Sequence, residues 1–137
     1  MSKIADLKNF IENWLKTHPD IEPVPPKMAT SRQVHLTVWR TRSKGRPIGF
    51  EMDRVGVVNL WLTTLSVPAF LPTDVDVTKK VWKSDGWVDA VPDPTRKGRD
   101  GANSSLKPFE VFNTRPITKL GIRRIEDARS ILEQVVA

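Results

Sequence analysis

The stretch QVHLTVWRTRSKGRPIGFEMDRVGVVNLWL, residues 33–62, decides the fold. It holds three runs in which apolar and polar side chains alternate, at residues 33–40, 48–53 and 55–62. Such alternation is typical of β-strands that bury one face. The turn between the first two runs contains Gly45 and Pro47, residues that favour a change in chain direction. The stretch therefore predicts an antiparallel, three-stranded meander.

If the aliphatic side chains of these runs all face one core, the other face of the meander is polar and aromatic. It would collect Thr37, Trp39, Glu51, Asn59 and Trp61. Exposed indole rings stack on nucleic-acid bases, each contact contributing about 1 to 3 kcal/mol. Trp39 and Trp61 are therefore candidate base-stacking residues, and with Asn59 and Glu51 they could line a pocket for an unstacked or modified base. The alternative is that a helix covers this face, because Trp is usually highly buried.

Both ends of the chain have the three-and-four spacing of amphipathic helices. Residues 3–17 carry one apolar stripe, and the segment from Ile125 onward carries another. Between the first helix and the meander, residues 19–26 contain four prolines, which predicts an extended, semi-rigid tether. We expect an N-terminal amphipathic helix (1–18), a Pro-rich tether (19–31) and a single α+β domain (32–137).

The region after the meander allows two interpretations. Thr73 and Asp76 have the spacing of a capping box, which predicts a helix from 73 to about 84. The alternative is a hairpin that turns at residues 85–86 and places Trp82 diagonally from Trp87. Further on, residues 109–112 and 117–124 are expected to be short strands. The whole chain reads as α+β, with an antiparallel sheet of three to five strands, amphipathic helices at both termini and a long basic loop.

Composition narrows the function classes. The chain has 137 residues and no cysteine, which excludes disulfides, thiolate metal sites and a cysteine nucleophile. No apolar run approaches the roughly 20 residues of a membrane helix, and residues 1–10 lack the core of a signal peptide. We expect a cytoplasmic protein that does not contact membranes and needs no metal or other cofactor.

Positive charge is concentrated in two separate segments, the turn 40–46 and the loop 92–108. The formal net charge is +6, which favours polyanionic partners. The loop has 17 residues with almost no apolar side chain, and connections longer than about 12 to 15 residues are usually binding loops or disordered. We expect the two segments to converge on one anion-binding surface formed by Arg40, Arg42, Lys44, Arg46, Arg96, Lys97, Arg99, Asn103, Ser104, Ser105 and Lys107.

The sequence thus predicts a small, basic, non-enzymatic domain that binds nucleic acid or another polyanion. One alternative is a protein-interaction or inhibitor module that uses the N-terminal helix or the loop 92–108, and the same helix could join two copies of the chain. Another alternative is a metal-independent RNase in which His35 is the general base and Arg40 or Lys107 stabilises the phosphorane. Phosphate-binding glycine motifs and nucleophile elbows are absent from the sequence.

Overall fold

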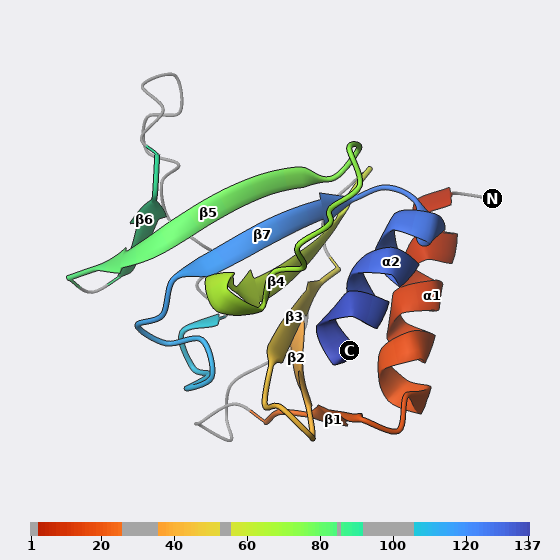
Figure 1. The fold of residues 1–137 in the computed structure, drawn as a ribbon, viewed down its shortest axis with the longest axis horizontal. Helices are drawn as coiled ribbons and strands as arrows, with labels where there is room; N and C mark the ends of the chain where they lie inside the picture. The colour runs from red at the N-terminus through yellow and green to blue at the C-terminus, as the bar shows by residue number, and fades with distance from the viewer. Residues whose placement is uncertain (1–2, 26–35, 53–55, 85, 92–105) are drawn as a thin grey trace.

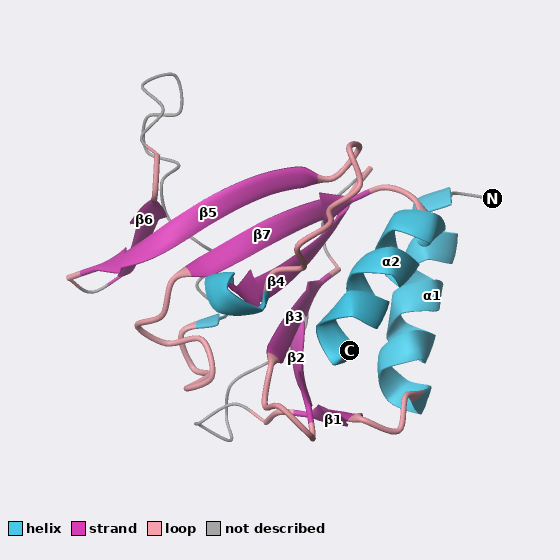
Figure 2. Ribbon diagram, viewed as in Figure 1, coloured by secondary structure: helices cyan, strands magenta, loops and turns pink. Residues whose placement is uncertain are grey.

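The computed structural model describes residues 3–25, 36–52, 56–84, 86–91 and 106–137. Within them the chain forms two α-helices and one antiparallel sheet of seven strands, in the order β1-β2-β3-β4-β7-β5-β6 (Figures 1 and 2). The strands are β1 (Ile21–Pro23), β2 (Leu36–Thr41), β3 (Pro47–Glu51), β4 (Val58–Thr63), β5 (Asp76–Lys83), β6 (Gly86–Asp89) and β7 (Ile117–Ile122).

The α+β class is confirmed, but the expectation of three to five strands is wrong. The meander is present as β2, β3 and β4, paired antiparallel in sequence order. Helix α1 (Lys3–Thr17) and helix α2 (Ile125–Val136) form near the two ends of the chain, and a short 3-10 helix, η1 (Thr64–Ser66), follows β4. The additional strands are β1, β5 and β6, in segments where the sequence favoured a tether or a helix.

One additional strand lies in the proline-rich segment. Residues Ile21–Pro23 form β1, which pairs with β2 at the edge of the sheet. Prolines are tolerated at such an edge because a strand there needs hydrogen bonds on one side only. The division of the chain into helix, tether and domain remains a prediction.

Two further strands replace the helix predicted from residue 73. β5 and β6 form a hairpin, in which Trp82 is directly opposite Trp87 rather than diagonal to it. The β-branched residues Val77, Thr78 and Val81 favour a strand, and their combined preference outweighs a single capping-box match. The expected strand at 109–112 is also wrong, because these residues form successive turns in which Phe109 N–H bonds to Leu106 O and Phe112 N–H bonds to Phe109 O. The strand expected at 117–124 is present as β7.

The central strands are buried on both faces of the sheet, and each face has its own apolar cluster. On one face the two helices pack over the central strands, with Leu7, Ile11 and Leu132 completely buried. On the other face residues 106–112 lie against the sheet and insert Leu106, Phe109 and Phe112, which have no exposed surface. Every residue of β3 and β4 is accordingly buried.

The prediction that one face of the meander is polar and aromatic is wrong, because its five residues are divided between two covered faces. Trp39 is opposite Ile48 and Thr37 is opposite Phe50, so both lie on the helix-covered face. Glu51, Asn59 and Trp61 lie on the other face. Alternation cannot assign faces to strands that are buried on both sides.

Neither described helix is long and apolar enough to cross a lipid bilayer.

Candidate nucleic-acid interface

Two cations of the turn between β2 and β3 cap the C-terminal end of helix α2. Arg46 Nη1 donates to Val135 O at 2.6 Å and to Ala137 O at 3.2 Å, and Lys44 Nζ donates to Ala137 O. Carbonyls in the last turn of a helix lack intrahelical donors and carry partial negative charge. The side chains of Arg46 and Lys44 therefore have a structural role at this helix end.

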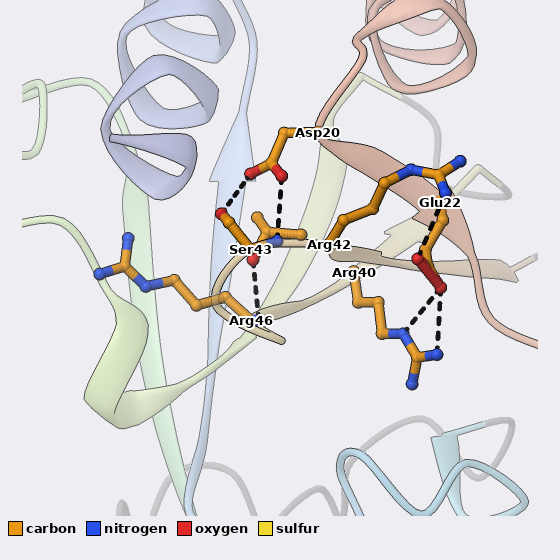
Figure 3. A network of polar contacts seen from close by, with 7 residues as sticks. Asp20, Glu22, Arg40, Arg42, Ser43 and Arg46 are labelled. Atoms are coloured by element: carbon orange, nitrogen blue, oxygen red, sulfur yellow. Dashed lines mark hydrogen bonds and ion pairs between the residues drawn. The ribbon is translucent and has the colours of Figure 1, made fainter.

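The other two cations of the turn face an acidic residue on β1 (Figure 3). Glu22 Oε2 accepts from Arg40 Nε at 3.2 Å and from Arg40 Nη2 at 3.0 Å, while Arg42 Nη1 is 3.7 Å from Glu22 Oε1. The Arg40 and Arg42 side chains keep 45% and 59% of their surface exposed. These two guanidinium groups could still meet a phosphate, but in competition with Glu22.

A second carboxylate fastens the same turn. Asp20 accepts the Ser43 hydroxyl at 2.7 Å and the Ser43 backbone N–H at 3.0 Å. The hydroxyl bond is the main cause that lowers the pKa of Asp20 from its ordinary value of 3.8. With two carboxylates and the end of α2 bound to it, the turn is well explained as a structural element.

The remaining exposed cations gather elsewhere. Among the residues that the structure describes, four exposed basic side chains have neither a carboxylate within ion-pair distance nor another polar or aromatic partner. They are Lys79, Lys83, Lys107 and Arg115. All four belong to the β5–β6 hairpin or to the segment that packs beside it, at the edge of the sheet opposite β1.

Three contacts place Lys83, Lys107 and the main chain of Arg115 near the end of the hairpin. Lys83 is paired with Gly86, the first residue of β6. Lys107 Nζ is only 3.8 Å from the point where a Cβ on Gly86 would stand. The carbonyl of Arg115 accepts the indole N–H of Trp87 at 2.7 Å. Strand alternation puts Lys83 on the helix-covered side of the sheet, so the cations border the hairpin end from both sides.

An indole ring lies at the same end of β5, on the face opposite Lys83. Trp82 is partly exposed and meets the buried Trp87 edge to face, with ring centroids 4.9 Å apart and an interplanar angle of 88°. Its N–H donates to Ser84 O at 3.1 Å, which fixes the ring. Lys79 lies at the other end of the hairpin, where its carbonyl accepts the Ala90 N–H. We name Trp82, Lys83, Lys107 and Arg115 the hairpin-end surface. Sequence reasoning missed most of it, although the hairpin alternative already placed Trp82 near Trp87.

Six of the predicted binding residues lie outside the described part of the chain: Arg96, Lys97, Arg99, Asn103, Ser104 and Ser105. They belong to residues 92–105, which connect Val91, just after β6, to Leu106. The described member of this group, Lys107, lies beside β6 and thus at the opposite edge of the sheet from the turn 40–46. Among the described residues the two basic segments do not converge.

The two predicted stacking residues lie on opposite faces. Trp61 is 3% exposed and its indole N–H donates to Glu51 Oε2 at 2.9 Å, while Asn59 Nδ2 donates to Glu51 Oε1 at 3.0 Å. This network gives the buried carboxylate of Glu51 two donors, as buried polar groups require. On the helix side Trp39 is partly buried and donates to Thr37 Oγ1 at 3.0 Å. The four residues proposed as a base pocket are thus divided between two cores.

The described residues contain few side chains arranged for catalysis. His35 lies outside them. His18 stacks on Trp14, with centroids 4.6 Å apart, and its Nδ1 accepts the Asp20 N–H at 3.1 Å. Within the described ranges no three His, Asp or Glu side chains are grouped closely enough to hold a metal ion.

Comparison of the chain with protein-family models, with curated proteins and with solved structures gave no match in any of the three.

Proposed function

We propose that this chain is a non-enzymatic domain that binds nucleic acid, and that the hairpin-end surface makes the main contact. One observation carries the proposal: exposed cations without carboxylate partners lie on and beside the hairpin whose strand β5 also holds a fixed, partly exposed indole ring. Lys and Arg that neutralise phosphates release condensed counterions, which supplies affinity for any sequence. Aromatic rings add stacking with bases, and the combination is typical of proteins that bind single strands.

The residues between Val91 and Leu106 extend this proposal. They contribute Arg96, Lys97 and Arg99; Val91 directly follows β6, and Lys107, next to the other attachment point, lies beside Gly86. Asn103, Ser104 and Ser105 would add short hydrogen-bond donors to phosphate oxygens. Arg40 and Arg42 have a secondary role in the proposal, because Glu22 competes for both guanidinium groups.

The test compares two variants that each remove two positive charges. Lys83→Gln/Lys107→Gln changes the hairpin-end surface, and the matched control Arg40→Gln/Arg42→Gln changes the turn. Fluorescence anisotropy with a labelled single-stranded oligonucleotide is measured over a salt series. Each lost phosphate contact reduces the magnitude of the slope of log K against log salt by about 0.7. The slope should therefore fall by about 1.4 in the first variant and by less in the control.

Trp82→Ala separates stacking from charge. We expect it to weaken single-strand binding by about 1 to 3 kcal/mol while leaving the salt slope unchanged. Trp82→Phe keeps a ring and should recover part of the loss. Wild-type affinity that does not change with salt would contradict the proposal, and a stronger effect of the Arg40/Arg42 control would move the contact to the turn.

The sequence predicts two alternative functions, a protein-interaction module and a metal-independent RNase. Helix α1 buries Leu7, Ile11 and Leu15 completely, so the middle of its apolar stripe packs inside the molecule. A complex or a homodimer through this helix remains a prediction. The loop 92–108 as a protein-binding element remains a prediction. The RNase alternative also remains a prediction, and cleavage of RNA in EDTA that is lost in His35→Ala would favour it over simple binding.

A further inference from the structure

Phe70 holds an aromatic ring in solvent on a fixed main chain. Its side chain is 82% exposed. The Gln134 side chain on α2 bonds to both of its main-chain groups, with Gln134 Nε2 donating to Phe70 O at 2.8 Å and Phe70 N donating to Gln134 Oε1 at 3.4 Å. Aromatic side chains, Phe included, are enriched in the buried core of protein interfaces.

Phe70 forms one wall of a groove of about 560 Å³. The other wall is the solvent-facing side of α2. The groove is lined by Phe70, Glu126, Arg129, Ser130, Glu133, Gln134 and Ala137. An apolar ring thus stands beside a charged helix face with a small residue, Ser130, near its middle.

The charges on this helix face are self-complementary. Arg129 lies between Glu126 and Glu133 in the sequence, and none of the three forms an ion pair with the described residues. Arg129 Cζ instead lies 5.3 Å from the centroid of the Phe10 ring. A twofold axis level with residue 131 would set α2 antiparallel to its copy. It would place Arg129 across from Glu133 of the second copy, and Glu133 across from its Arg129.

We infer that two copies of this chain associate through α2 and Phe70. In an isologous contact the same patch meets itself, so each ion pair and each ring contact occurs twice. The ring of Phe70 packs into the groove of the second copy, and two Arg129–Glu133 pairs border it. α2 covers the half of the sheet away from the β5–β6 hairpin (Figure 1), so the dimer leaves both hairpin-end surfaces open. This inference does not depend on nucleic-acid binding.

Sedimentation equilibrium of the full chain tests the inference. We expect wild type to approach twice the chain mass of 15.5 kDa as its concentration rises. Arg129→Glu and Glu133→Arg each place like charges in contact and should raise the dimer dissociation constant by about tenfold or more. The double variant Arg129→Glu/Glu133→Arg restores opposite charges and should restore the dimer.

Two apolar variants complete the experiment. Phe70→Ala should weaken the dimer, whereas Leu65→Ala removes an even more exposed apolar side chain outside the groove and should not. Circular dichroism verifies that each variant is folded. A wild-type chain that stays monomeric at every concentration overturns the inference. So does a dimer that is indifferent to Arg129, Glu133 and Phe70, or a double variant that fails to recover.

Discussion

Thr114 adopts a backbone conformation that its side chain disfavours. Its φ is +66°, in the left-handed region, where a β-branched residue is rare. It directly precedes Arg115, whose carbonyl accepts the Trp87 indole N–H. The hydrogen bond and the packing of 106–112 hold the turn in place, so the strain lies beside the hairpin-end surface.

Relief of this strain is measurable. Thr114→Gly removes the Cβ that conflicts with positive φ, whereas Thr114→Ala keeps it. We expect the Gly variant to have a free energy of unfolding about 1 kcal/mol greater than the Ala variant, because the strain exceeds the entropy that glycine adds to the unfolded chain. Urea denaturation measures both. An Ala variant as stable as the Gly variant would mean that the turn carries no such strain.

Asp20 gives a prediction that depends on pH. Its lowered pKa means that folding favours the ionised carboxyl, so its contribution to stability is complete above the ordinary value of 3.8 and is lost as pH falls through the lowered value. Ser43→Ala removes the hydroxyl but keeps the backbone donor, and should raise the Asp20 pKa back toward 3.8. NMR titration of the carboxyl carbon follows this change. An unaltered Asp20 midpoint in the variant would show that the hydroxyl is not the cause.

Among the elements, the β5–β6 hairpin has a buried ion pair that joins its strands. Lys80 and Asp89 are opposite each other in register, with Nζ and Oδ1 2.5 Å apart, and their side chains are 2% and 6% exposed. Lys80→Met leaves a buried carboxylate without this partner and should cost about 3 to 5 kcal/mol of stability. The double variant Lys80→Met/Asp89→Leu removes both charges and should recover most of the loss. Chemical denaturation measures each variant, and equal losses in the single and double variants would argue against an ion-pair penalty.

The same hairpin shows where sequence reasoning failed at the scale of an element. A capping box is a signal of two residues, whereas the preference for a strand is distributed over Val77, Thr78 and Val81 and is completed only when β7 pairs alongside. The strands of the meander and β7 were predictable because their patterns are long and local. Residues 109–112 look like a strand, yet their rings are buried by turns that fold back on the sheet.

At the scale of the whole molecule, the strand order determines which predicted site residues lie near one another, and this order could not be predicted from the sequence. The sequence identified the basic turn and the basic loop, but not that the described flank of the loop lies at the opposite edge of the sheet from the turn. It also could not show that Glu22 and the end of α2 occupy the cations of the turn. Such partners are 18 to 93 residues away in the sequence, beyond the reach of any local pattern.

The position of β7 between β4 and β5 has a consequence for synthesis on the ribosome. Until residues 117–122 emerge, the nascent chain holds two separate pieces of sheet, β1–β4 and the β5–β6 hairpin, with no strand to join them. The outer edge of β4 is apolar and unpaired during this interval, and open strand edges invite association with other chains. A ribosome that stalls before residue 117 would therefore present a species prone to aggregation, so the last strand to be made is the one that completes the sheet.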